Sequence, residues 1–267
     1  MFWRARRPHV DQEDEAWLIE CWQWLTGLLG PIDGDPPRQF VLPARQFFPA
    51  TDVTGHARAL HYFDLVRGYM GLADRHYELV VQAERPNLGS SVAFGNMETK
   101  GADGTYSVRG NTARITYDPG ILNDPMKTIA VFAHELAHDV LLNQPSEPPG
   151  GPDMEEFATD LATVHLGFGL FGANVAFEFR QFTDFDRQGW SYSRTGYLGE
   201  NEWGFAISLF LALQGGEPRE IDSFLKPHLL SVIKRAHRYL VANPELIAPL
   251  RWREARSTRL RSSVRPW

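Results

Sequence analysis

The chain has 267 residues, of which 43% are hydrophobic and 22% are charged. This mixture excludes a low-complexity or disordered chain and predicts a protein that buries a substantial core. A formal net charge of -6 argues against a protein that coats nucleic acid with its whole surface. Cys21 is the single cysteine, which excludes an intrachain disulfide and a four-cysteine zinc site.

The ends of the chain differ from its body in charge. Basic residues at the N-terminus are followed by acidic residues at 11–15, where a signal peptide needs an apolar core, so we expect no export signal. The single cysteine favours a reducing, cytoplasmic location. The most apolar stretch, 161–177, is too short and too interrupted to predict a membrane span. Residues 251–267 carry six arginines and form a basic tail. We interpret this tail as a solvated terminus, with docking on an acidic surface such as nucleic acid as the alternative.

The first half of the chain predicts two helices and a small sheet. Apolar residues recur at helical spacing over 17–29, a helix that Gly30-Pro31 ends, and again over 55–72. A short extended piece at 40–43 separates these helices. Strand patterns then follow at 77–81, 91–94, 104–109 and 112–117, and the glycine-bearing turns at 101–104 and 110–111 predict antiparallel hairpins.

The second half predicts helices. Asp124 followed by proline is a strong helix start, and this helix is expected to run to about residue 142. A loop rich in proline and glycine at 144–152 precedes a second helix that begins near Asp153, and further helices are expected at 202–213 and 226–241. The apolar stretch 161–177 is interpreted as buried core.

The run His134-Glu135-Leu136-Ala137-His138 lies within the helix that Asp124 starts. Residues four apart stand on one face of a helix, so the imidazoles of His134 and His138 are predicted to converge on one metal ion. Neutral imidazole is a good zinc ligand, and Glu135 is placed to act as general base on a metal-activated water. The alternative is that both histidines are ordinary helix histidines and Glu135 is a solvated charge.

Catalytic zinc usually has three protein ligands, so a third must come from elsewhere. The second helix offers Glu156 and, four residues later on the same face, Asp160. With His134-Glu135-x-x-His138, this pair resembles the gluzincin zinc metallopeptidases over about residues 115–169. The resemblance implies that Glu156 is the third zinc ligand and that Asp160 hydrogen-bonds His134. The sequence Asp153-x-x-Glu156 is also typical of a helix capping box, in which the Glu156 side chain bonds to the backbone and does not bind metal. If Glu156 is not the ligand, Glu155 is the nearest substitute.

The resemblance also implies a tyrosine or histidine that stabilises charge on the substrate carbonyl. Tyr197, Tyr192, His228 and His237 all qualify by their order in the chain, and Tyr197 is preferred because its loop directly precedes a helix. His165 lies half a helical revolution from Glu156 and is interpreted as a core histidine. The strand at 112–117 resembles the edge strand along which such enzymes bind an extended peptide.

Together these observations predict an α+β, zincin-like fold with a small N-terminal sheet, a metal-binding helix and a helical C-terminal lobe. The expected division is 1–124 for the N-terminal helices and sheet, 125–250 for the metal helix and helical lobe of the same catalytic unit, and 251–267 for the tail. The expected function is a zinc-dependent endopeptidase with one Zn²⁺ ion and a peptide or protein substrate. Alternatives are a zinc-containing but non-proteolytic binding or regulatory protein, and a zinc hydrolase of non-peptide amides.

Overall fold

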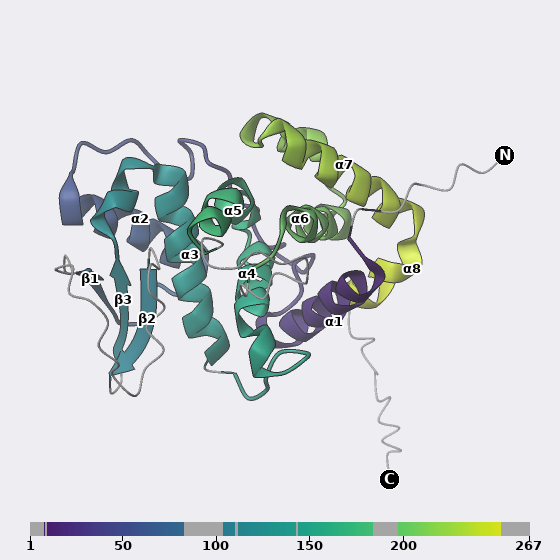
Figure 1. Cartoon of the computed structure of the whole chain (residues 1–267), viewed down its shortest axis with the longest axis horizontal. Helices are drawn as coiled ribbons and strands as arrows, with labels where there is room; N and C mark the ends of the chain where they lie inside the picture. The colour runs from purple at the N-terminus through teal and green to yellow at the C-terminus, as the bar shows by residue number, and fades with distance from the viewer. Residues whose placement is uncertain are drawn as a thin grey trace, which may run out of the picture.

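The protein has an α+β fold in which a small three-stranded mixed sheet is followed by helices (Figure 1). The computed structural model describes residues 8, 10–82, 104–109, 112–142, 144–183 and 197–251. The expected strand at 91–94 and the turn at 110–111 lie outside the described residues. The helical character of the second half is confirmed.

The first helix, α1 (Gln12–Leu29), begins five residues earlier than its apolar pattern predicted. The Asp11 carboxylate accepts hydrogen bonds from the backbone amides of Glu13 and Asp14, and this N-cap extends the helix through a polar first turn. Gly30 ends α1 as expected. The second helix, α2 (Gly55–Tyr69), is confirmed, whereas residues 40–43 form no strand.

The sheet contains β1 (Tyr77–Val81), β2 (Gly104–Arg109) and β3 (Thr112–Tyr117) in the order β1-β3-β2. β2 and β3 pair antiparallel, as the turn residues predicted, while β1 pairs parallel to β3. The prediction that β3 is an edge strand is wrong, because β3 has a hydrogen-bonded neighbour on both sides. Among the described strands, β2 is the edge that lies next to the following helix (Figure 1).

That helix is α3 (Pro125–Leu142), with the bounds that the sequence predicted. The Asp124 carboxylate accepts hydrogen bonds from the amides of Met126 and Lys127, which satisfies two free donors of the first turn. Phe132 on α3 packs edge-on against Tyr117 of the sheet and Phe63 of α2, with ring centroids 5.8 and 5.5 Å away. These aromatic contacts fix α3 between α2 and the sheet.

The apolar stretch after α3 consists of α4 (Glu155–His165) and α5 (Gly169–Thr183), separated by a left-handed turn at Gly167. α6 (Glu200–Gln214), α7 (Pro227–Ala242) and the short α8 (Pro244–Ile247) complete the helical part. The helices expected near 202–213 and 226–241 are therefore confirmed, each slightly shifted at its ends. α4 confirms the second helix expected to begin near Asp153. A separate helix at α5 was not predicted, because apolar residues dominate 161–177 and give no clear amphipathic pattern.

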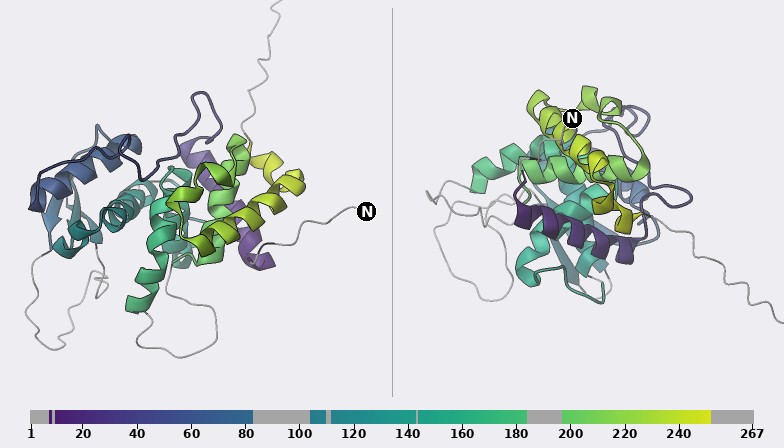
Figure 2. Two further views of the ribbon diagram at one scale, coloured as in Figure 1. Left: turned by 90° about the horizontal axis from the view of Figure 1, so that it is seen from above. Right: turned by 90° about the vertical axis from the view of Figure 1, so that its right-hand side faces the viewer.

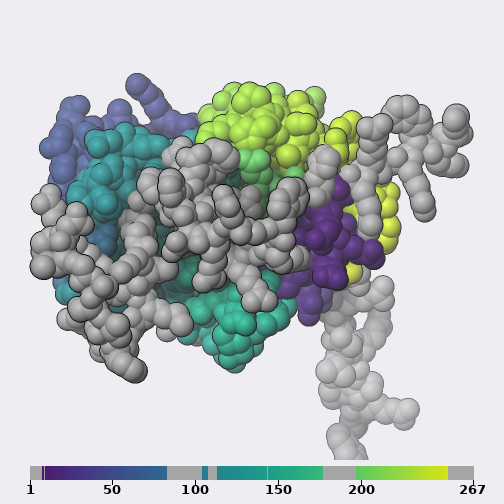
Figure 3. Space-filling model, viewed as in Figure 1, coloured from purple at the N-terminus to yellow at the C-terminus, as the bar shows by residue number. Residues whose placement is uncertain are grey.

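The view from above places α2 and the sheet at one end of the described structure and α1, α7 and α8 at the other (Figure 2, left). In the space-filling view, α7 in yellow-green forms the upper surface near α1 in purple (Figure 3). α3 and α4 lie between these ends, so the helices that carry the candidate metal ligands are central. No helix of the described residues combines the length and apolar character needed to span a membrane.

Candidate metal centre

The two histidines of α3 face one point. Their ring centroids are 4.7 Å apart at an interplanar angle of 83°, and the Nε2 atom of His138 lies 3.1 Å from the Nε2 atom of His134. Spacing of four residues places both rings on one helical face, as the sequence predicted. Both side chains are largely buried, with exposed fractions of 15% and 13%.

α4 brings a carboxylate to the same point. The Oε2 atom of Glu156 lies 3.2 Å from His134 Nε2 and 3.5 Å from His138 Nε2. One ligand atom from each of these three residues lies within 4.8 Å of the others, so the group can hold a metal ion. The capping interaction of Asp153 with Glu156 is not formed, because α4 begins after Met154 without a side-chain cap.

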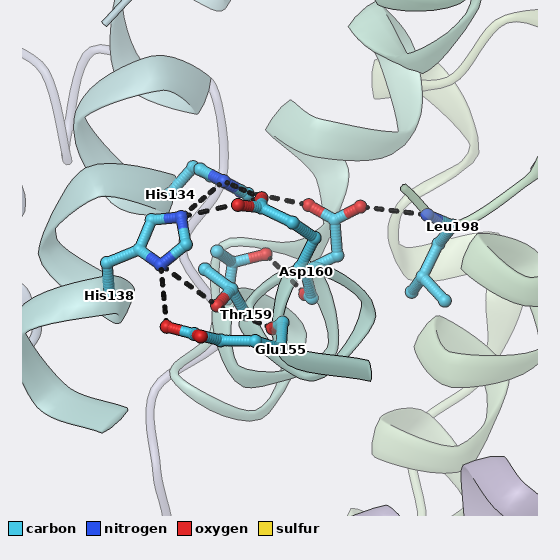
Figure 4. Close-up of polar contacts among 8 residues, drawn as sticks. His134, His138, Glu155, Thr159, Asp160 and Leu198 are labelled. Carbon is cyan, nitrogen blue, oxygen red and sulfur yellow. Dashed lines mark hydrogen bonds and ion pairs between the residues drawn. The ribbon is translucent and has the colours of Figure 1, made fainter. Parts of the chain in front are cut away.

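The Asp160 carboxylate connects His134 with a distant segment (Figure 4). Its Oδ1 atom lies 3.0 Å from His134 Nδ1, and its Oδ2 atom accepts a hydrogen bond of 2.9 Å from the backbone amide of Leu198. Because an ionised carboxylate only accepts hydrogen bonds, His134 donates through Nδ1, and its neutral tautomer then has the Nε2 lone pair directed at the cluster. This tautomer is the one that binds a metal through Nε2.

The electrostatics of the cluster favour positive charge. Burial opposes charge on His134, but hydrogen bonds with Asp160 and Glu156 outweigh it and raise the pKa of His134 well above its usual value. Burial likewise opposes charge on Glu156, but hydrogen bonds with both histidines outweigh it and hold the pKa of Glu156 well below its usual range. A site with an ionised carboxylate beside two imidazoles suits a divalent cation.

Glu135 points into a tightly packed region between α3 and β2. Its side chain is buried, with an exposed fraction of 7%, and this burial raises the pKa of the carboxyl group. Gly104 of β2 packs directly over it, since a Cβ atom on Gly104 would lie 3.0 Å from Glu135 Oε1 and 2.8 Å from Val131 Cγ1. β2 therefore approaches α3 closely beside the candidate general base.

Asp139, the residue after His138, attaches the sheet to α3. Its buried carboxylate accepts hydrogen bonds of 2.7 Å from the hydroxyls of Tyr77 on β1 and Tyr106 on β2, and it also pairs with Arg75. No pattern in the sequence singled out this group. Asp139 stands four residues after Glu135 on α3, so both side chains lie on the face of the helix that packs against the sheet. This spacing could have indicated that Asp139 contacts the sheet.

The residues considered for stabilising charge on a substrate carbonyl differ in their distance from the histidine cluster and in their contacts. The ring of Tyr197 lies 5.6 Å from that of His134. His237 is buried and bonds the Gly216 carbonyl at 3.0 Å, while His228 is exposed and pairs with Glu200. Tyr192 lies outside the described residues. Of the described candidates, Tyr197 is therefore the one whose ring packs on the histidine cluster.

His165 and Glu155 both lie outside the group of three candidate metal ligands. His165 is fully buried, with its ring centroid 5.1 Å from that of Trp22, so the interpretation as a core histidine is confirmed. The Oε1 atom of Glu155 lies 4.0 Å from Nδ1 of His138, on the opposite side of the ring from Nε2. Glu155 therefore does not share the point at which Glu156 meets the histidines.

Comparison with known proteins gives no relative: no family model, no curated protein and no solved structure matches this chain. The gluzincin resemblance consequently depends on the residues of α3 and α4 themselves. Their geometry provides a group that can hold a metal ion.

Proposed function

We propose that this chain is a zinc-dependent metallopeptidase in which His134, His138 and Glu156 bind one Zn²⁺ ion. The convergence of their three ligand atoms within 4.8 Å carries the proposal. Two imidazole nitrogens and one carboxylate oxygen are a donor set of catalytic zinc sites, in which the fourth position remains open to water or substrate. The partial burial of all three side chains supports such a site, since it limits competing water.

Zinc in this position supplies Lewis acidity toward a water molecule and a substrate carbonyl. Glu135 then accepts the proton of the attacking water and returns it to the leaving amine nitrogen. Its place between the two histidines on α3 and its burial under Gly104 support this role. The Tyr197 hydroxyl donates a hydrogen bond to the carbonyl oxygen as charge develops there, a role that the contact of its ring with His134 supports.

The substrate in this proposal is an extended peptide. Since β3 is the central strand of the described sheet, the edge of β2, and not β3, is the strand along which the peptide binds in this proposal. A strand edge offers backbone amides and carbonyls to a peptide, so binding there depends little on side chains.

Metal content and peptide cleavage test the proposal separately. Purified wild-type protein is expected to contain one zinc per chain, and His138→Ala to lose it, because two remaining ligands bind zinc weakly. Glu135→Gln is expected to retain zinc and to lose about 100-fold or more of its cleavage of a peptide library. His228→Ala is the matched control, since His228 is exposed and belongs to α7.

The outcomes separate the rival functions. Zinc bound without cleavage of any peptide would favour the non-proteolytic binding or regulatory protein. Cleavage that persists in Glu135→Gln would contradict the role of Glu135. Equal zinc content in wild type and His138→Ala would contradict the site itself.

A further inference from the structure

Each histidine of the cluster has a hydrogen-bond partner on α4 for the ring nitrogen that points away from the cluster (Figure 4). For His134 this partner is Asp160. For His138 it is Thr159, whose Oγ1 atom lies 3.3 Å from Nδ1. Thr159 is fully buried, and the expectations drawn from the sequence gave it no role.

The direction of the hydrogen bond between Thr159 and His138 follows from the single proton of the hydroxyl. Thr159 donates that proton to the backbone carbonyl of Glu155 at 2.9 Å, one helical turn earlier. The hydroxyl oxygen therefore has only lone pairs to offer to His138, so Nδ1 of His138 is the donor. The proton on Nδ1 leaves the lone pair on Nε2, the atom that faces His134 and Glu156.

We propose that Thr159 is a positioning residue for the metal site: it fixes the tautomer and the ring orientation of His138 so that Nε2 is available to the metal. The inference rests on the proposed zinc site. It makes α4 the element that orients both histidines of α3, through Asp160 for His134 and Thr159 for His138. Such partners of metal-binding histidines commonly change metal affinity by 10- to 100-fold when they are removed.

Glu155 is the nearest alternative partner of His138. Its Oε1 atom is 4.0 Å from Nδ1, beyond hydrogen-bond distance, and its side chain is 41% exposed. Thr159 is closer and buried, so it is assigned as the partner. A small movement would nevertheless let Glu155 accept the same proton, and a test on Thr159 alone would then underestimate its contribution.

Zinc affinity of four variants tests the assignment. Thr159→Val keeps the shape of the side chain but removes the acceptor, and we expect it to bind zinc about 10-fold more weakly than wild type. Thr159→Ser keeps the hydroxyl and is expected to bind like wild type. Glu155→Leu alone, which removes the alternative acceptor, is also expected to bind like wild type, while Thr159→Val with Glu155→Leu should bind more weakly than Thr159→Val. Circular dichroism of each variant establishes that it is folded.

A spectroscopic measurement reads the tautomer in the unaltered protein. In zinc-loaded wild-type protein labelled with ¹⁵N-histidine, long-range ¹H–¹⁵N spectra should show His138 protonated at Nδ1 and metal-bound through Nε2. The Nδ1 proton should exchange with solvent faster in Thr159→Val than in wild type.

The results distinguish this inference from the proposed function. Wild-type affinity in both Thr159→Val and the double variant, or coordination of His138 through Nδ1, would overturn the role of Thr159 alone. A protein that binds zinc with the expected variant pattern but cleaves no peptide would overturn only the peptidase. A wild-type protein without zinc affinity would overturn both.

Discussion

At the scale of single residues, His165 makes stability depend on pH. Its Nδ1 atom is buried without a hydrogen-bond partner, and burial together with the nearby positive charge of Arg38 lowers the pKa of His165 to about 3. In the unfolded chain a histidine has a pKa near 6.5. Between these values the unfolded state binds a proton that the folded state does not, so stability falls as pH decreases from about 6.5 toward 3.

His165→Phe is therefore expected to reduce the loss of stability between pH 7 and pH 5. The aromatic contact with Trp22 remains possible, and Thr26 keeps its hydrogen bond to the Trp22 carbonyl. The titration of His165 contributes at most about 1.4 kcal/mol per pH unit, which urea unfolding at each pH measures. An equal slope in wild type and His165→Phe would disprove the assignment.

Helical periodicity made much of the candidate site predictable at this scale. It placed His134 and His138 on one face of α3 and Glu156 and Asp160 on one face of α4. The contacts of Thr159 and of the Leu198 amide were not predicted, since they depend on how α4 crosses α3 and on where a distant loop returns. Thr159 lies three residues after Glu156, so the periodicity that selected Asp160 also offered Thr159.

At the scale of elements, the Asp139 carboxylate attaches β2 to α3, beside Glu135. Tyr106→Phe removes a hydrogen bond to a buried charged group and is expected to lower stability by about 1.5–3 kcal/mol. Amide hydrogen exchange should become faster in β2 and β3, because these strands lose a contact with the helix. Urea unfolding and exchange followed by mass spectrometry measure the two effects.

Tyr239→Phe on α7 is the matched control for that substitution. Its hydroxyl also donates to a buried carboxylate, Glu15 on α1, at the other end of the molecule from the sheet (Figure 1). It should affect exchange in α1 and α7 and leave β2 and β3 as they are. Unchanged exchange of the sheet in Tyr106→Phe would show that Asp139 does not hold β2 in place.

Local pattern predicted the positions of these elements better than their arrangement. The bounds of β1, β2, β3 and α3 follow from alternation, turns and the Asp124 cap. The order of the strands was not predictable in this way, because β1 pairs parallel with β3 across an intervening segment. α5 was missed because apolar residues dominate 161–177, and the turn at Gly167 that divides them has no strong local signal besides the glycine.

At the scale of the whole molecule, residues 32–41 join the N-terminal part of the chain to the central helices. The side-chain amide of Gln214 on α6 donates to the carbonyls of Ile32 and Arg38. The amide of Val41 donates to the carbonyl of Gly167 at 2.9 Å. α4, which carries Glu156, Thr159 and Asp160, ends two residues before Gly167, so this junction supports the helix behind the candidate metal site.

Gly167 is the position at which this junction tolerates no side chain. Its φ of +95° disfavours other residues, and a Cβ atom there would lie 2.2 Å from the carbonyl oxygen of Gln39. Gly167→Ala is expected to lower the free energy of unfolding by about 2–5 kcal/mol, the sum of backbone strain and displacement of the 39–41 backbone. Gly215→Ala separates the two costs, because Gly215 has a φ of +72° with open space around it and should lose only about 1–2 kcal/mol. Urea unfolding, followed by tryptophan fluorescence and by circular dichroism, measures the free energy of unfolding of both variants. An equal loss of stability in the two variants would show that the backbone of residues 39–41 moves away from the new methyl group at no energetic cost. These residues would then not support α4.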